Sequence, residues 1–180
     1  MRCINALIFT LAVAGFSCAA YECNDSSIEA TTKPQNFILD NVKGTVTDLR
    51  FGLMWDMCSF GQQYNAELKQ CDGDPASVNS WSEAIFTQDE MNSSSAKGFE
   101  DWRLPNIKEL QSIVERQCSQ PAIRLSIFKG TANGVYWSNT PDNTVNPEMN
   151  GRIIDFSDGL EFFRATSPVR FVRHVRVISN

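Results

Sequence analysis

The sequence predicts an α+β protein in which two helices lie in the middle of the chain and strands lie at both ends. Two helix-start signals occur between residues 80 and 109, and extended apolar segments stand on either side of them. An Asp-Gly turn near the C-terminus predicts a hairpin. This order of elements favours an antiparallel sheet whose first and last strands lie together.

Each predicted helix starts at a capping residue. Ser80 is followed three residues later by Glu83, and Asn106 is followed by Glu109 at the same spacing. This spacing is typical of a capping box, in which the two side chains satisfy backbone N–H groups at the helix start. Apolar residues at helical spacing give the second helix a face directed to a core, namely Ile107, Leu110, Ile113 and Val114.

The predicted strands alternate apolar and polar residues or form short apolar runs. A hairpin is expected between residues 152–156 and 160–163, because Asp158-Gly159 supplies the positive φ of a tight turn. The other expected strands span residues 44–48, 53–57 and 135–138, and one strand or strand pair spans 169–178.

Residues 1–20 have the pattern of a secretory signal peptide. Arg2 is followed by a nearly continuous apolar run over residues 4–16, and small residues precede an expected cleavage after Ala19 or Ala20. The alternatives are an uncleaved anchor, for which the run is shorter than about 20 residues, and a lipidated Cys18. We therefore expect an exported protein, in the periplasm, at the cell surface or outside the cell, with a polar arm at 21–36 and a folded domain at 37–180.

Four cysteines remain after residue 20, and an even number in an exported protein predicts two disulfides. Cys58 and Cys71 are close in sequence and flank a polar stretch, so we expect them to pair. Cys23 would then pair with Cys118 and pin the arm to the body. The alternative is a zinc site, but the spacing lacks the C-x2-C pairs that such sites use.

Composition excludes several classes of function. The net charge of −5 argues against a general nucleic-acid binder, and a single histidine leaves little scope for a His-based metal site. No motif for a nucleophilic serine, a zinc protease or a phosphate-binding loop occurs. We expect no cofactor, no metal site and no membrane-spanning segment after residue 20. Asp72 and Asp74 offer carboxylates to Ca²⁺, although a polar turn is the simpler interpretation.

The C-terminal 30 residues differ in charge from the rest. They hold five arginines against three acidic residues, whereas residues 21–150 hold ten basic and 18 acidic groups. Arg170 and Arg176 share strand parity if no bulge or turn separates them. Such a row could bind sulfate or carboxylate groups, which arginine recognises through two parallel hydrogen bonds. The alternative is that these side chains pair with neighbouring acids or solvate a strand. The candidate ligand-binding arginines are Arg152, Arg164, Arg170, Arg173 and Arg176.

Trp137 and His174 have two interpretations each, and Asn139 starts a candidate recognition loop. Trp137 is a core residue or a stacking platform for a sugar, whereas Trp55 and Trp102 lie in apolar runs typical of a core. Asn139 begins a polar loop at residues 139–150 of the kind that carries recognition on a rigid body. His174 lies on a predicted strand, where it contacts a ligand or is simply exposed.

Five segments in order resemble one bacterial family. They are GTVTD at 44–48, GLMW at 52–55, DWRLPNIKEL at 101–110, YWS at 136–138 and VRFVR at 169–173. Together they resemble the Lcl C-terminal domain family, named for the terminal domain of collagen-like bacterial adhesins. The resemblance implies a compact domain similar to C-type-lectin-like folds, without a general enzymatic activity. It also implies adhesion and the binding of sulfated glycans.

The sequence therefore favours an exported, non-catalytic binding module that recognises a glycan or a surface protein. Two other hypotheses remain open. One is a structural subunit of an envelope assembly, and the other is an envelope enzyme that uses carboxylates and His174.

Overall fold

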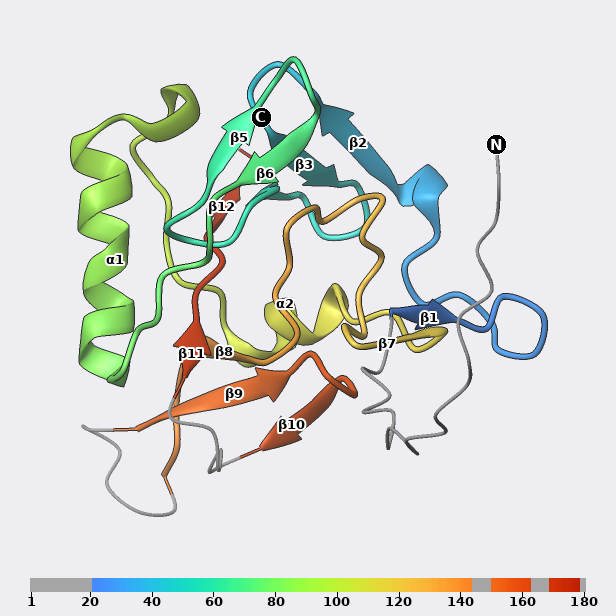
Figure 1. Ribbon diagram of the computed structural model, residues 1–180. Helices are drawn as coiled ribbons and strands as arrows, with labels where there is room; N and C mark the ends of the chain where they lie inside the picture. Colours follow the sequence, from blue (N-terminus) through green and yellow to red (C-terminus); the bar gives the residue numbers. More distant parts are fainter. Residues whose placement is uncertain (1–20, 144–149, 163–168, 179–180) are drawn as a thin grey trace, which may run out of the picture.

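The computed structural model describes residues 21–143, 150–162 and 169–178, and it confirms the α+β class (Figure 1). Two four-stranded sheets and two helices make up the body. The helices are α1 (Trp81–Ser93) and α2 (Ile107–Ser112), and the short 3-10 turns are η1 (Pro34–Asn36) and η2 (Ala96–Gly98). The predicted signal peptide at 1–20 lies outside the described residues.

The first sheet joins the start of the domain to its end. Its strand order is β12-β4-β3-β2, and all its pairs are antiparallel. The expectation that early and late strands lie together is confirmed by Val175, which pairs with Trp55. The strand bounds are β2 (Phe37–Asp40), β3 (Thr45–Asp48), β4 (Leu53–Asp56) and β12 (Val175–Val177).

The second sheet has the order β10-β9-β8-β11 and contains the predicted hairpin. Gly159 at φ +78° and the Asp158 carboxylate, which accepts the backbone N–H of Leu160, form the turn. We expected an antiparallel sheet, but β11 pairs with β8 in parallel, so this expectation is wrong for one pair of the second sheet. The strand bounds are β8 (Val135–Pro141), β9 (Gly151–Asp155), β10 (Leu160–Phe162) and β11 (Arg170–Phe171).

The core has two parts, one on each face of the second sheet. Tyr136 and Ile154 belong to the cluster that also holds Trp55 of the first sheet. Trp137 and Ile153 belong to a second cluster, which packs against Trp81 of α1. Because neighbouring residues of a strand point to opposite faces, β8 and β9 serve both clusters at once.

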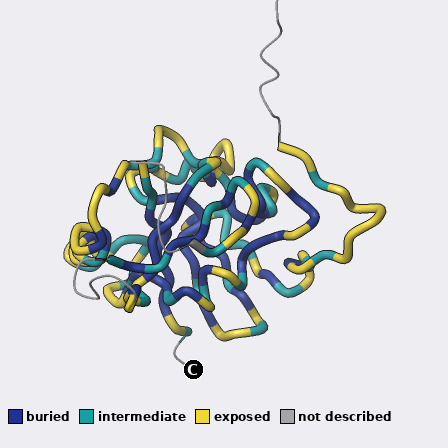
Figure 2. The backbone as a smooth tube through the Cα atoms, turned by 90° about the horizontal axis from the view of Figure 1, so that it is seen from below, coloured by how far each residue is buried: buried dark blue, intermediate teal, exposed yellow. Residues whose placement is uncertain are grey.

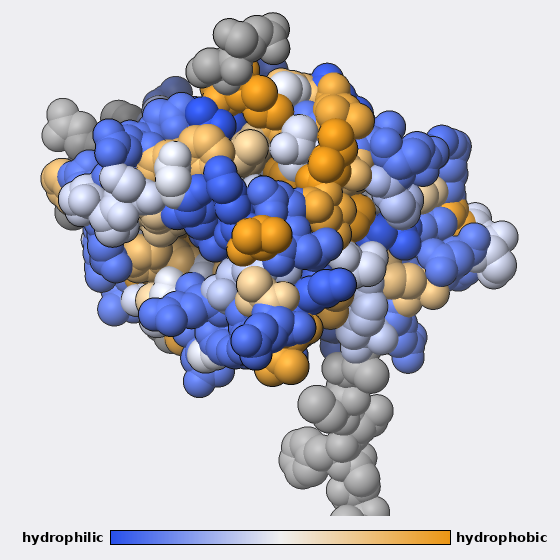
Figure 3. Space-filling model, turned by 90° about the horizontal axis from the view of Figure 1, so that it is seen from above, coloured by the Kyte–Doolittle hydropathy of each residue, from blue (hydrophilic) through white to orange (hydrophobic). Residues whose placement is uncertain are grey.

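Burial is concentrated at the centre of the molecule, as Figure 2 shows. Some large apolar side chains are nevertheless exposed, including Val42, Leu49 and Phe51. The face seen from above carries a hydrophobic stripe bordered by hydrophilic residues (Figure 3). Such exposed apolar surface is where docking sites are to be sought.

The block at residues 101–105 holds the sheet to α2. Trp102 and Leu104 are buried, whereas Asp101 and Arg103 alternate with them and form ion pairs. Arg103 exchanges two backbone hydrogen bonds with Val175 of β12. Its guanidinium also binds Glu109, whose carboxylate accepts the Asn106 N–H in the predicted capping box. This block therefore has a structural role.

The predicted start of α1 is also confirmed. The Ser80 hydroxyl accepts the N–H of Glu83 at 3.1 Å. The Glu83 carboxylate, however, accepts the N–H of Asn79 rather than that of Ser80, so only half of the capping box forms.

Both disulfides pair as the cysteine spacing predicts. Cys58 is bonded to Cys71, and Cys23 is bonded to Cys118. The first bridge ties the chain after β4 to the hairpin of β5 (Gln63–Asn65) and β6 (Gln70–Asp72). The second accompanies the pairing of β1 (Glu22–Cys23) with β7 (Cys118–Ser119).

The arm at 21–36 is held to the body by more than its disulfide. The Glu115 carboxylate is fully buried and accepts the backbone N–H and the hydroxyl of both Thr31 and Thr32. The amide of Gln117 donates to the Ile28 carbonyl at 2.5 Å. The later half of the arm is thus part of the fold.

Candidate functional site

The predicted row of C-terminal arginines does not form one surface. The row was expected because Arg170 and Arg176 share strand parity if no interruption separates them. Residues 172–174 leave the strand between β11 and β12, so Arg170 belongs to the second sheet and Arg176 to the first. Each arginine therefore has to be considered by itself.

Arg173 is a buried structural residue, and its placement as a ligand-binding candidate is wrong. Its side chain is fully inaccessible, and its guanidinium donates to the carbonyls of Asp56 and Met57. It also donates to the hydroxyls of Thr131 at 2.8 Å and Ser59 at 3.3 Å. These acceptors lie at the end of β4, in the segment directly after it and at residue 131, so Arg173 ties the end of the first sheet to the segment around residue 131.

Arg176 and Arg152 are both engaged by acidic neighbours. Arg176 is nearly buried, and its guanidinium binds the Asp101 carboxylate through two hydrogen bonds of 2.6 and 3.1 Å. This contact with Arg176 holds the pKa of Asp101 below its ordinary value. Arg152 binds Glu161 at 2.9 Å across the β9–β10 hairpin. Arg164 lies outside the described residues.

Arg170 differs from these arginines. It is half-buried, and its guanidinium carbon lies 4.7 Å from the centre of the Trp137 ring. Within the described ranges no carboxylate lies within ion-pair distance of it, and its Nε has no hydrogen-bond partner. A cation held over an indole and left without an anion is a candidate anion-binding group.

Trp137 is a core residue, not a stacking platform. Only 4% of its surface is exposed, and its indole N–H donates to the Val78 carbonyl at 3.0 Å. The Arg170 side chain covers its ring. Its contribution to a binding site is therefore indirect, because its ring supports the Arg170 guanidinium.

Asn139 does not begin a loop as expected, because β8 continues to Pro141; its side chain is exposed on this strand. Its backbone N–H donates to the Pro105 carbonyl at 2.8 Å, which fixes this end of the strand. The predicted recognition loop continues into residues 144–149, which lie outside the described residues.

His174 is buried, contrary to the expectation of an exposed strand residue. One per cent of its surface is accessible, and Nε2 lies 2.8 Å from the Thr87 hydroxyl on α1. That hydroxyl donates to the Ala84 carbonyl, so the imidazole is the donor to Thr87. Burial, together with the neighbouring Arg173, lowers the pKa of His174 to about 3. A buried imidazole with this low pKa is not placed to act as a general base, so the structure does not support the role of His174 in the enzyme hypothesis.

Acidification is expected to destabilise the protein through His174. Its folded pKa of about 3 lies below the ordinary 6.5, so between these values the unfolded chain binds one more proton. The free energy of unfolding therefore falls as the pH falls below 6.5, by up to about 1.4 kcal/mol per pH unit. Urea unfolding at pH 7.5, 6.5 and 5.5 measures this slope.

The His174→Gln variant is the control, because glutamine keeps an N–H donor and does not titrate. The chain has no other histidine, so the slope above pH 5.5 is expected to flatten in the variant. An equal slope in the variant and the wild type would assign the acid sensitivity to another group.

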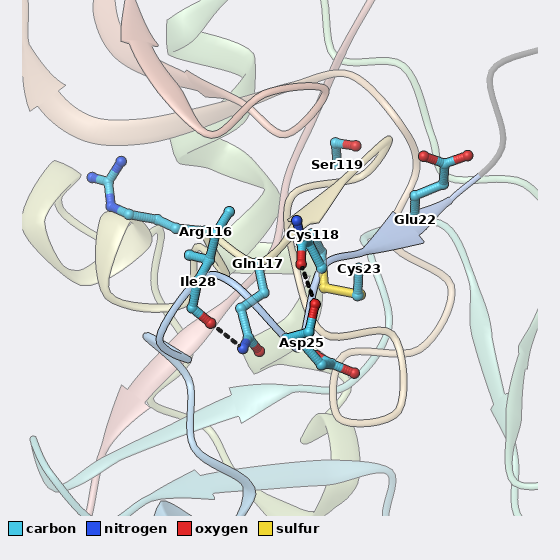
Figure 4. Close-up of a pocket in the computed structure, with 10 residues that line it drawn as sticks. Glu22, Cys23, Asp25, Ile28, Arg116, Gln117, Cys118 and Ser119 are labelled. Carbon is cyan, nitrogen blue, oxygen red and sulfur yellow. Dashed lines mark hydrogen bonds between the residues drawn. A yellow bond between two sulfur atoms is a disulfide. The ribbon is translucent and has the colours of Figure 1, made fainter.

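An open cavity of about 560 Å³ lies between the arm and residues 116–119 (Figure 4). Glu22, Asp25 and Arg116 line it beside the Cys23–Cys118 disulfide. Its walls are formed largely by exposed residues, so it is a surface hollow of mixed charge.

The described residues contain no group of three or more His, Cys, Asp or Glu side chains arranged to hold a metal ion. Asp72 instead accepts hydrogen bonds from the amides of Asn65 and Gln70. Over the same residues, no helix combines the length and hydropathy of a membrane span.

The comparisons with known proteins support one assignment. No curated protein and no solved structure matches the chain. The Lcl C-terminal domain matches residues 44–176, which is most of the chain and runs from the start of β3 into β12. The chain therefore belongs to the Lcl C-terminal domain family.

Proposed function

We propose that this protein is an exported, non-catalytic binding module that recognises an anionic glycan through Arg170. Membership of a family of adhesin-like terminal domains supports a binding role. The two disulfides support export, since such bonds persist in oxidising compartments. The proposed domain division is a signal peptide at 1–20, an arm at 21–36 and a C-type-lectin-like domain at 37–180.

The proposal rests on one observation, which is that Arg170 has no acidic partner among the described residues. Among the described arginines of the predicted row, Arg152 and Arg176 have acidic partners and Arg173 has four oxygen acceptors. Arg170 has the Trp137 ring instead. A sulfate or carboxylate of a glycan would supply the missing anion, and the exposed Asn139 amide would be available to sugar hydroxyls.

A glycan array tests this site. Arg170→Ala is expected to weaken binding to sulfated or carboxylated glycans by about 10-fold or more, the effect of losing a charge-assisted hydrogen bond. Arg116→Ala removes an exposed arginine at a different place and is expected to leave binding unchanged.

The outcomes separate the competing functions. Equal binding by the wild type and Arg170→Ala would exclude Arg170 as the site. If the wild type bound none of the glycans on the array, the proposal that it recognises a glycan would be rejected. Co-purification with envelope proteins would then support a structural subunit.

A further inference from the structure

A second concave site lies between the β3–β4 turn and α2. It is a groove of about 310 Å³ lined by Phe51, Leu53, Asn106, Lys108, Glu109 and Ser112. None of these residues belongs to the Arg170 site. A volume of this size is at the lower end of the range of small-molecule pockets.

The apolar wall of the groove is an aromatic ring that is exposed and yet held in place. Phe51 is 57% exposed, and the guanidinium of Arg50 lies 5.1 Å from its ring centre. Arg50 is fixed by the buried Asp48 carboxylate at 2.7 Å and by the Ser112 carbonyl at 3.0 Å. The ring is thus supported from one side, so covering its other side costs little side-chain entropy.

The aliphatic part of the wall comes from the adjacent strand. Leu53 lines the groove and is largely buried, and its cross-strand partner Val177 is 53% exposed. Phe51 therefore supplies most of the exposed hydrophobic surface of the groove, and the largely buried Leu53 adds a smaller part.

The charge on the groove is positive. Burial opposes ionisation of Glu109, but the bond with Arg103 and the Asn106 N–H lower its pKa, so this carboxylate is already engaged. Lys108 is exposed, and no hydrogen bond or ion pair to it occurs within the described part of the chain. The ammonium group that remains available favours an anionic ligand.

From the ring, the volume and the free ammonium, we propose that this groove binds a small carboxylate with an apolar body about the size of one aromatic ring. The apolar part would lie on Phe51 and Leu53, and the carboxylate would face Lys108. This site is independent of the proposed glycan site, since it uses different residues and a different cationic side chain.

Three probes that share a phenyl group test the proposal on the full mature chain. They are 4-phenylbutyrate, 4-phenylbutanol and 4-phenylbutylamine, titrated by two-dimensional NMR of the ¹⁵N-labelled protein. The acid is expected to bind most tightly and the amine most weakly, with shifts at residues 51–53 and 106–112.

Two groove variants and two matched controls locate the binding. Lys108→Gln is expected to weaken 4-phenylbutyrate about 2- to 5-fold, the range of an exposed ion pair, and to leave the alcohol unchanged. Phe51→Ala is expected to weaken both ligands about 10-fold through the loss of the ring. The controls Lys69→Gln and Phe86→Ala remove an exposed lysine and an exposed phenylalanine elsewhere and are expected to change nothing.

Several results would overturn the proposal. They are the absence of saturable binding by the acid, tighter binding of the amine, and equal affinity of Lys108→Gln and the wild type for the acid. Weakening by either control variant would also overturn it. Lys108 is exposed and unpaired in the described structure, so Lys108→Gln remains informative even if Phe51→Ala unfolds. Loss of glycan binding by Arg170→Ala bears only on the other site.

Discussion

Replacing Arg173 by alanine is expected to destabilise the protein by about 3–5 kcal/mol, the cost of breaking a buried charged network. The guanidinium is fully buried and donates to two carbonyls and two hydroxyls from β4, the segment after it and residue 131. Alanine would leave these acceptors without donors and open a cavity. Equilibrium urea unfolding at pH 7.5 measures the loss.

Arg170→Ala is the matched control, because it removes an arginine from the same segment at a half-buried position without an acidic partner in the described structure. We expect it to cost less than about 1 kcal/mol. The structural role of Arg173 would be refuted if both variants unfolded at the wild-type urea concentration.

Glu115→Gln is expected to cost about 2–4 kcal/mol and to loosen the arm. The buried carboxylate accepts from Thr31, from Thr32 and from the N–H of Gln117, and it lies 3.3 Å from the guanidinium of Arg124. A glutamine has one acceptor oxygen and would turn an N–H₂ group towards these donors. Hydrogen exchange at residues 28–36 would report the loosening, and urea unfolding would report the free energy.

The pH dependence of the free energy of unfolding shows whether Glu115 stabilises the arm through its negative charge or only through its packing. Burial alone would raise the pKa of Glu115, but the hydrogen bonds from Thr32, Gln117 and Thr31 lower it to about 2. The stabilisation is therefore complete above the ordinary 4.5 and is lost as the pH falls towards 2. The difference in the free energy of unfolding between the wild type and Glu115→Gln should therefore become smaller as the pH is lowered from 7 to 2.5.

Glu67→Gln, at the exposed tip of the β5–β6 hairpin, controls for the loss of one negative charge. It is expected to change stability by no more than about 0.5 kcal/mol. If the difference in the free energy of unfolding between the wild type and Glu115→Gln did not change with pH, the charge of Glu115 would not be what holds the arm.

Local features of the structure were predictable because they depend on residues close in sequence. The capping box of Asn106 and Glu109 and the Asp158-Gly159 turn need only a few residues and form as expected. The cysteine pairing follows from a spacing and an even count. Core positions such as Trp55 and Trp102 follow from their apolar neighbours.

The placement of polar side chains was much less predictable. The local sequence around an arginine is the same whether its side chain faces water or buried acceptors, so the residues near Arg173 did not predict its burial. The burial of His174 was not predictable for the same reason, because its partner Thr87 is 87 residues away. The groove at Phe51 had no signal either, since α2 completes it from more than 50 residues further along.

The sequence by itself determined the α+β class, the helix starts, the disulfide pairs and the family, all of which rest on local pattern or ordered motifs. The tertiary structure decided which charges are available. The chain leaves the sheet at residues 172–174, and this break sends Arg170 and Arg176 to different sheets and turns Arg173 inward. The physical reason is that a buried charge must find its acceptors on whatever elements the fold brings near, and these are distant in sequence.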